Sequence, residues 1–325
     1  MPAIAEIDQP PAIVVDDLSG LRGALDAALP VKDGTHVLLG TWNIRAFGGL
    51  TPKWRTDAAD SPRRNLADVV AIAEIVSRFD VCAIQETRGD LTALRTLMRR
   101  LGEDWGFVVT DVGESAAAND ERLAYLFDRR RVRFSGLAGE LVLAEEGFGD
   151  AATPLRKQFA RSPYMVSFET GPVDDPVGFT LVSLHVVFGH AVADRTPEIR
   201  TFANRLKARA EDPDEFGRNM IALGDFNIDR WLNDPNADAF RSEGLTPPDE
   251  LLGLPRTVFD DPEKPHFYDQ MAWFTSGSRE VLSLNYRKQA GFVNWVPYLL
   301  IDLTDVQKSW RISDHFPLWA RFELP

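Results

Sequence analysis

Residues 36–44 read HVLLGTWNI, a mostly apolar run of strand length that carries the amide side chain of Asn43 near its end. We expect this run to be the first strand of the domain proper, residues 35–325. The preceding residues, 1–34, are rich in Pro, Asp and Ala. They are expected to form an N-terminal extension with one short helix around Leu18–Leu29.

The rest of the chain mixes helical and strand patterns without strict alternation. Ser61-Pro62 precedes apolar residues at helical spacing, which predicts a helix with Pro at its first position. Two further helices are expected at 91–101 and from Thr196 to about Ala210. Strands are expected at 81–84, 106–110, 123–127, 132–134, 164–169, 179–187, 219–224 and 318–324. This order argues against a doubly wound parallel sheet, and the absence of repeats or a clear linker favours one domain.

The charge balance limits how this protein could bind nucleic acid. The 325 residues include 36 Lys plus Arg and 49 Asp plus Glu, for a formal net charge of −13. That balance argues against a general basic surface that coats nucleic acid. It is compatible with an enzyme that holds a few phosphates locally while a metal ion supplies the positive charge.

The start of the chain gives no targeting signal. It reads MPAIAEIDQP, with acidic residues where a secretory signal needs basic ones followed by an apolar run. No segment approaches the roughly 18 apolar residues of a membrane span. The single cysteine, Cys82, cannot form an internal disulfide. We therefore expect a cytoplasmic protein.

Polar side chains end or follow several of the apolar runs. They are Asn43, Glu86, His185, Asp225 with Asn227, Asp269, and Asp314 with His315. Such a side chain at the end of a buried strand is held rigidly at the rim of a sheet. A single Asp after a strand is more often a helix cap or turn residue, but the whole set indicates a site. Carboxylates, amides and imidazoles together suit Mg²⁺ or Mn²⁺.

Five motifs carry a resemblance to a known family. They are GTWNI (40–44), IQE (84–86), SLH (183–185), GDFN (224–227) and ISDHFP (312–317). Their order and spacing resemble the endonuclease/exonuclease/phosphatase superfamily over residues 36–323. The resemblance implies an α/β fold of the α+β type: a four-layer sandwich of two packed mixed β-sheets flanked by helices, with the site at one rim of the paired sheets.

The resemblance also implies roles for the motif residues. Glu86 resembles the main metal carboxylate, with Asn43 and Asp314 as its neighbours. Asp225 and Asn227 resemble the pair that orients the water and a phosphate oxygen. The cofactor implied is Mg²⁺ or Mn²⁺.

Two acidic residues point to the deoxyribonuclease-I-like branch. Glu121, which precedes RLAYLF, resembles the carboxylate that supports a catalytic His, here His185. Asp269 in FYDQ resembles the Asp that supports the second His, here His315. Such a carboxylate fixes the tautomer and raises the basicity of its imidazole. One imidazole could then accept a proton from water while the other donates to the leaving oxygen.

The resemblance to that branch is incomplete. Arg88 and Arg161 resemble its phosphate-contacting arginines. The Arg that often follows the Asp of FYD is Gln270 here, and residues 112–120 read VGESAAAND where the branch has a tyrosine loop that binds the minor groove. These differences put double-stranded DNA in doubt as the substrate and leave the hydrolytic centre intact.

Three hypotheses follow. The first is a divalent-metal-dependent phosphodiesterase of the nuclease kind, with nucleic acid as the expected substrate. The second is a phosphomonoesterase or lipid-headgroup phosphodiesterase, of the inositol-phosphatase or sphingomyelinase kind, on the same fold. The acidic balance keeps this alternative open. The third, an inactive binding module, would require the loss of a central residue, and none is missing.

Overall fold

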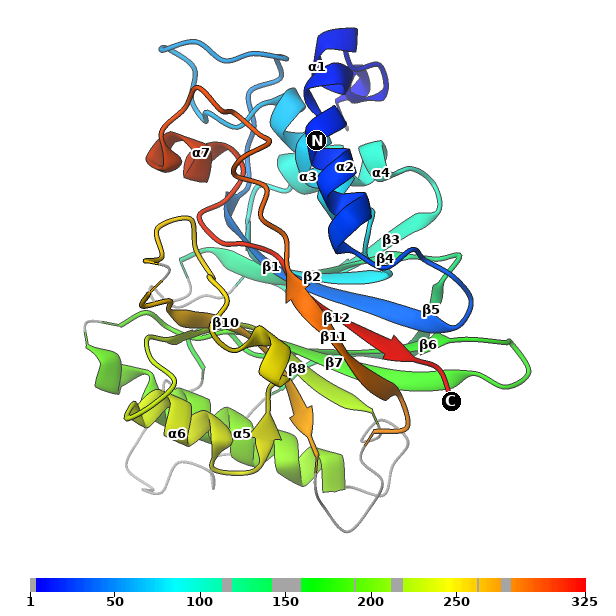
Figure 1. Ribbon diagram of the computed structural model, residues 1–325, viewed down its shortest axis with the longest axis vertical. Coiled ribbons are helices and arrows are strands. Elements are labelled where there is room, and N and C mark those ends of the chain that lie inside the picture. The colour runs from blue at the N-terminus through cyan, green and yellow to red at the C-terminus, as the bar shows by residue number, and fades with distance from the viewer. Residues whose placement is uncertain are drawn as a thin grey trace.

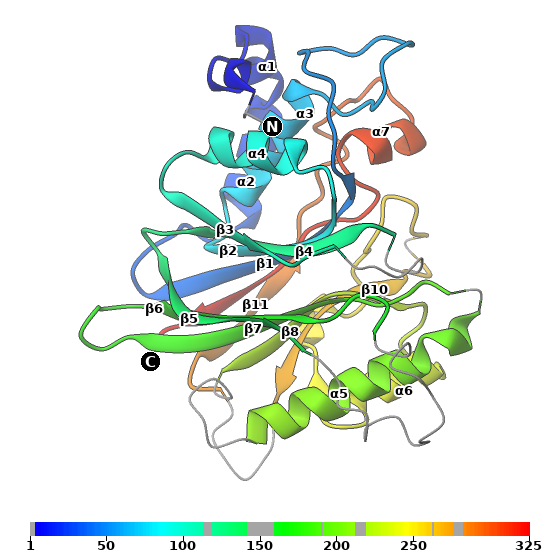
Figure 2. The same cartoon turned by 180° about the vertical axis from the view of Figure 1, so that it is seen from behind.

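Two β-sheets pack face to face, with helices on both outer sides (Figures 1 and 2). The computed structural model describes residues 4–112, 119–141, 159–189, 191–211, 219–261, 263–275 and 282–325. Within these residues the architecture is the four-layer sandwich of two mixed sheets that the sequence predicts. The loop at 112–120 falls largely outside the described residues. No helix in the described part of the chain has the length and apolar character needed to cross a membrane.

Each sheet has six strands and one parallel pair. The first has the order β11-β12-β1-β2-β4-β3, and only β1 and β2 are parallel. The second has the order β5-β6-β7-β8-β10-β9, and only β7 and β8 are parallel. Since the carboxyl ends of parallel strands meet at one edge, each pair brings its last residues together.

The strand bounds are as follows. The first sheet contains β1 (His36–Phe47), β2 (Val81–Arg88), β3 (Trp105–Val109), β4 (Glu121–Asp128), β11 (Asn285–Phe292) and β12 (Leu318–Glu323). The second contains β5 (Val132–Glu140), β6 (Tyr164–Thr170), β7 (Val177–His185), β8 (Met220–Ile228), β9 (Leu245–Thr246) and β10 (Phe267–Phe274). The sequence did not predict β9, β10 or β11.

The helices form the two outer layers. On the side of the first sheet lie α1 (Ala12–Asp17), α2 (Ser19–Ala28), α3 (Leu66–Val76) and α4 (Thr92–Leu101), and on the side of the second lie α5 (Thr196–Glu211) and α6 (Pro235–Arg241) (Figure 2). The short α7 (Asp305–Arg311) lies beside one rim (Figure 1). Three 3₁₀ turns complete the described elements: η1 (Ala5–Asp8), η4 (Val192–Asp194) and η6 (Asp249–Leu251).

The start of α3 corrects one prediction. Ser61-Pro62 does not begin this helix, which starts at Leu66. Asn65 is the N-cap, because its side chain accepts from the backbone N–H of Asp68 and the Asp68 carboxylate accepts from that of Asn65. A reciprocal capping box of this kind satisfies two amides that would otherwise lack partners, which Pro62 could not do.

The N-terminal helices share the core of the first outer layer. Leu18, Leu21 and Leu25 are buried in the same apolar cluster as Val69 of α3 and Leu94 of α4. Residues 19–28 form the short helix expected near 18–29. The boundary between an extension and a domain at residue 35 stays a prediction.

Gly224, which opens the GDFN motif, is required by the close approach of β7. Its φ is +127°, and a Cβ there would lie 2.1 Å from the carbonyl oxygen of Leu184. We expect Gly224→Ala to lower the free energy of unfolding by about 3 kcal/mol or more, measured by urea denaturation. Gly139→Ala is the control, because a Cβ at Gly139 would meet nothing within 4 Å. Its effect is expected to stay within about 1 kcal/mol. Equal effects of the two substitutions would contradict the steric argument.

Candidate active site

The alternation of side chains along the strands collects the polar candidates in the layer between the sheets. Val37 and Leu39 of β1 lie in the core of that layer, so Asn43 points the same way. The same period of two applies to the other central strands. The polar residues that share the inward face with this core include Asn43, Gln85, Glu121, His185, Asp225 and Asp269. They occupy one end of the layer, beyond its apolar part.

Asp269 reaches this end differently from the prediction, which placed it after an apolar run. It is the third residue of β10, near the beginning of that strand, and Glu121, which was expected to precede an apolar run, is the first residue of β4. Strand β4 is antiparallel to β2, and this pairs Glu121 with Arg88. Strand β10 is antiparallel to β8, and this pairs Asp269 with Asp225. The rim is thus built from the ends of some strands and the beginnings of others.

Glu86 departs from the alternation. Strand pairing on both sides of β2 shifts register around this residue, and Glu86 has a left-handed backbone with φ of +60°. Its Oε2 accepts from the backbone N–H of Ala46 at 2.8 Å. A strained, non-glycine backbone at a bulge re-aims a side chain and is typical of functional positions.

Among the influences on the pKa of Glu86, burial is the largest, and it opposes ionisation. The two nearby imidazoles, the N–H of Ala46 and the amide of Asn43 outweigh it, so the pKa of Glu86 stays below its ordinary value. Glu86 is therefore a carboxylate at neutral pH, as a metal ligand must be.

Two buried oxygens of the predicted metal residues have no hydrogen-bond partner among the residues that the structure describes. They are Oδ1 of Asn43 and Oδ1 of Asp314. A buried acceptor without a partner is costly unless an ion or water satisfies it. An amide oxygen, a carboxylate oxygen and an ionised Glu are donors that fit Mg²⁺ or Mn²⁺. The residues thus fit the expected ion, and their assignment as its ligands stays a prediction.

A buried arginine that the sequence did not single out supports this region. Arg64 is 2% exposed and donates to four backbone carbonyls. The acceptors are those of Arg45, Ala46, Arg311 and Ile312. Arg64 therefore ties the turn that holds Glu86 to the segment that leads into Asp314 and His315. Burial lowers the pKa of Arg64 to about 10, although the charges of nearby carboxylates act in the opposite direction. Arg64 therefore remains a cation at neutral pH.

His185 and Glu121 come from opposite sheets and meet at the rim. Glu121 Oε2 lies 3.1 Å from His185 Nδ1 and 2.7 Å from Nε of Arg161. These contacts are close polar pairs without the alignment of a hydrogen bond. Arg88 lies 3.3 Å from the other oxygen, Oε1, which also accepts from the amide of Asn119. Glu121 thus contacts both predicted phosphate-binding arginines and one predicted catalytic histidine.

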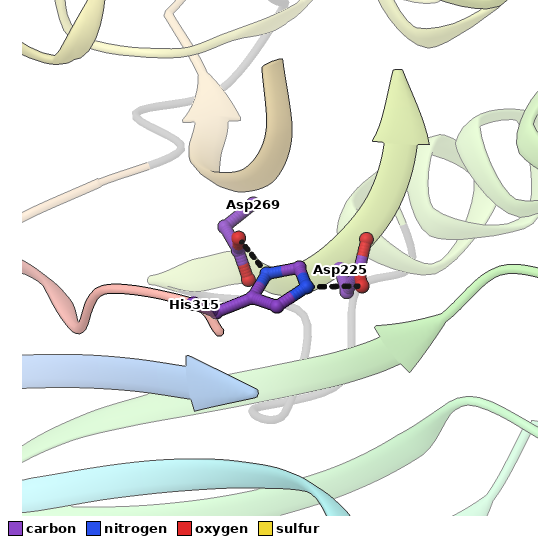
Figure 3. A group of neighbouring side chains, drawn as sticks. All are labelled: Asp225, Asp269 and His315. Atoms are coloured by element: carbon purple, nitrogen blue, oxygen red, sulfur yellow. Dashed lines mark hydrogen bonds and ion pairs between the residues drawn. The ribbon is translucent and has the colours of Figure 1, made fainter. Parts of the chain in front are cut away.

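His315 is held firmly on three sides. Its Nδ1 is 2.6 Å from Oδ2 of the fully buried Asp269. Its backbone N–H donates to Ser313 Oγ, and its carbonyl accepts from the indole of Trp42. These contacts leave Nε2 facing Asp225 (Figure 3).

The carboxylates around His315 decide its protonation. Burial is the largest influence and would lower the pKa of its imidazole. The charge and hydrogen bond of Asp269, with the charges of Asp225 and Asp314, outweigh it and raise the pKa well above its ordinary value. His315 is therefore a cation at neutral pH and can donate a proton.

The two histidines converge on one carboxylate oxygen. Asp225 Oδ2 is 3.7 Å from Nε2 of His185 and 3.9 Å from Nε2 of His315. The same oxygen accepts from Nδ2 of Asn43 at 3.0 Å. Asp225 thus lies between two imidazoles, each of which has a carboxylate at its other nitrogen.

Asn227 is fixed through its backbone and its amide. Its φ is +51°, its Nδ2 donates to the carbonyl of Val186, and its N–H donates to Oδ1 of Asp225. Its carbonyl accepts from Nη1 of Arg195 at 2.5 Å. The sequence did not identify Arg195, a buried arginine of the segment after β7.

One group of acidic and imidazole side chains in the described residues could itself hold a metal. It consists of Asp225, Asp269 and His315, whose candidate ligand atoms lie within 4.8 Å of one another (Figure 3). This group differs from the predicted metal residues, Glu86, Asn43 and Asp314. Because Asp269 and His315 already satisfy each other at 2.6 Å, we interpret the group as a proton-handling assembly.

The family model for the endonuclease/exonuclease/phosphatase family matches residues 40–315. The chain belongs to this family. The match begins at the GTWNI motif and ends at His315, so it includes all the predicted site residues. Membership and the relatives described below indicate a hydrolase that acts on phosphoesters, as a nuclease or phosphatase.

Relatives of this family member include deoxyribonucleases. A protein named deoxyribonuclease from Thioalkalivibrio sp. (strain K90mix) is 26% identical over 315 residues, which cover 93% of this chain and 76% of that protein. Deoxyribonuclease-1 of Canis lupus familiaris is 29% identical over 216 residues, or 64% of this chain and 66% of that protein. The predicted resemblance to the deoxyribonuclease-I-like branch is confirmed.

A solved structure of different activity shares the fold. The mannosyl-6-phosphatase Bt3783 of Bacteroides thetaiotaomicron has a TM-score of 0.53 at 17% identity, covering 88% of this chain and 99% of that one. At this identity the likeness concerns the fold alone. Membership of the family therefore leaves the substrate open.

Proposed function

We propose that this protein is a divalent-metal-dependent phosphodiesterase of the nuclease kind that hydrolyses a P–O bond with activated water. The observation that carries the proposal is the pair of histidines whose Nε2 atoms face Asp225 Oδ2 at 3.7 and 3.9 Å. An in-line displacement needs a proton acceptor on the attacking side and a donor at the leaving oxygen. Two imidazoles whose Nε2 atoms face the same carboxylate oxygen can supply both groups.

We assign the proton donor to His315 and the acceptor to His185. His315 is held as a cation by three carboxylates, so it can protonate the leaving oxygen. His185 contacts one carboxylate at Nδ1, and its Nε2 faces Asp225 Oδ2 at 3.7 Å. Asp225 and Asn227 are proposed to orient the water and a phosphate oxygen.

Glu86, Asn43 and Asp314 would hold the ion. When bound, Mg²⁺ or Mn²⁺ would neutralise charge that develops on the phosphoryl oxygens. The support for this assignment is the ionised state of Glu86 and one oxygen on each of the other two residues that has no hydrogen-bond partner in the described part of the chain.

Arg88 and Arg161 are proposed to bind substrate phosphates beside the reaction centre. Both contact Glu121, so part of their charge is already balanced. Charge from two partly balanced arginines is a weak basis for binding a highly charged duplex, but it is sufficient for one or two phosphates.

The test is a comparison of diester and monoester substrates. We expect bis(4-nitrophenyl) phosphate or a nucleic acid to be hydrolysed faster than 4-nitrophenyl phosphate in Mg²⁺ or Mn²⁺. Arg88→Ala and Arg161→Ala are expected to raise KM more than they lower kcat. Arg287→Ala is the control, because Arg287 is exposed and pairs with Glu323 at the other end of the first sheet.

A preference for an inositol phosphate, a sugar phosphate or a phospholipid would favour the alternative function, a phosphomonoesterase or lipid-headgroup phosphodiesterase. The mannosyl-6-phosphatase shares this fold, so this alternative must be tested directly.

The assignment of His315 predicts a pH effect. A proton donor must be protonated, so activity falls as the pH rises through its pKa. Asp269→Asn removes the charge that contributes most to the raised pKa, and the pKa of His315 should therefore fall. We expect the alkaline limb of the kcat profile to move to lower pH, by about one unit or more. An unchanged limb would exclude His315 as the donor. Asp261→Asn is the control, since Asp261 is exposed.

A further inference from the structure

Two exposed aromatic side chains flank the candidate site. Trp310 of α7 is 48% exposed, and Phe188, three residues after His185, is 60% exposed. Large apolar side chains with this much solvent contact contribute little to the core. Each is joined to the site through one arginine.

Trp310 lies on the side of the predicted metal ligands. The guanidinium carbon of Arg45 is 3.8 Å from the centre of the Trp310 ring. The same guanidinium donates to Ser309 Oγ at 2.7 Å and lies 3.4 Å from Asp314 Oδ2. One face of the indole is thus fixed against a residue that itself contacts the site.

Phe188 lies on the side of the second sheet. The guanidinium carbon of Arg195 is 4.4 Å from its ring centre, and Arg195 Nε donates to the Phe188 carbonyl at 2.7 Å. The same arginine donates to the carbonyl of Asn227 and pairs with Asp229 at 2.8 Å. This ring is therefore also held on one face and connected to the site.

We infer that Trp310 and Phe188 stack unpaired bases of a single-stranded polynucleotide on either side of the bond that is cut. This inference rests on the proposed function and names its substrate class. A ring that is already fixed on one face loses little side-chain entropy when a base stacks near it. Stacking tolerates any base, because every base has a π-face.

The charges around these rings favour stacking over phosphate binding. Arg45 contacts Asp314, and Arg195 pairs with Asp229, so neither arginine is a free cation. The chain as a whole carries a formal net charge of −13. Affinity for a polyanion therefore needs a contribution that does not depend on charge. The bases of a duplex are stacked on one another and cannot supply it, whereas unpaired bases can.

The inference is tested by binding without turnover. The full chain is titrated in EDTA with a fluorescein-labelled oligothymidylate of about a dozen nucleotides, and with an abasic oligonucleotide of the same length and charge. We expect oligothymidylate to bind more tightly than the abasic strand or a duplex. Trp310→Ala and Phe188→Ala are each expected to weaken its binding about tenfold, and equally at low and high salt.

Conservative and remote variants separate stacking from folding. Trp310→Phe and Phe188→Tyr keep a ring and are expected to retain most of the affinity. Phe134→Ala removes a ring that is 44% exposed on β5, away from the site, and should bind as the wild type does. Equal binding of oligothymidylate and the abasic strand by the wild type, or unchanged binding in both alanine variants, would overturn the inference. Turnover of bis(4-nitrophenyl) phosphate by the wild type, which requires no base, tests the proposed function separately.

Discussion

Glu86→Gln is expected to lower kcat on the order of 10³-fold while the fold stays intact. The amide keeps the shape of the side chain but removes the negative charge that would hold the ion. A bound metal ion contributes several kcal/mol of stabilisation to the charge that develops in the transition state. The N–H of Ala46, which donates to Glu86 Oε2, can donate equally to the amide oxygen of Gln. Steady-state kinetics with a diester substrate at saturating Mg²⁺ would measure the loss.

Metal binding gives this prediction a second readout. Titration calorimetry with Mn²⁺ should show much weaker binding in Glu86→Gln than in the wild type. Glu169→Gln, on β6 and in partial contact with solvent, is the control and should change neither quantity. Wild-type turnover by Glu86→Gln at saturating metal would show that another residue carries the ion. Asp225, Asp269 and His315 would then be the next group to examine.

Replacing either site histidine by Ala is expected to lower kcat about 10²–10⁴-fold, the range of general acid–base catalysis. The effect should fall on kcat more than on KM, because the imidazoles are proposed to act on protons in the transition state and the arginines to bind the phosphates. Both histidines are nearly buried at the rim, at 6% exposed for His185 and 9% for His315. Single-turnover kinetics would separate the chemical step from product release.

The double variant is a sharper measurement than either single one. If the two imidazoles serve one transition state, His185→Ala with His315→Ala should cost less than the product of the single effects. His266→Ala is the control, since His266 is 40% exposed at its side chain and pairs with Asp260 outside the catalytic pairs. A loss below tenfold for one site histidine would reduce the site to a centre with one essential histidine.

Much of the fold was predictable because apolar runs and motif order carry it. The strand at 36–44 and the helix near 18–29 have the expected type, and Asn43, Glu86, His185 and Asp225 lie in or near the ends of expected strands, whereas Asp269 lies in β10, which was not predicted. The period of two that puts Asn43, Asp225 and Asp269 on one face is present in the sequence, and it could have been used to predict that they share a layer. The helix start at Pro62 was wrong, because a capping box at Asn65 determines it.

The supporting residues could not be predicted from local sequence. Arg64 contacts carbonyls of residues 45–46 and 311–312, which are distant in the chain, and an arginine before a helix is usually a surface charge. Arg195 is similar, because its contact with the Asn227 carbonyl depends on the packing of the segment after β7 against the end of β8. Such contacts exist only once the sheets have assembled. The inferred stacking of bases likewise depends on two exposed aromatic side chains that no strand or helix pattern identifies.

The apolar layer between the sheets determines how far apart the two site histidines lie. Each proposed catalytic histidine and its carboxylate come from different sheets. His185 belongs to the second sheet and Glu121 to the first, whereas Asp269 belongs to the second and His315 lies between α7 and β12 of the first. The distance from the proposed donor to the proposed acceptor is therefore set by the volume of side chains such as Leu39, Leu223 and Met271, which are buried in the core between the sheets. A misplacement of about 1 Å can cost a large factor in rate. Evolution of this enzyme should accordingly constrain the bulk of that layer as tightly as the chemistry at its rim.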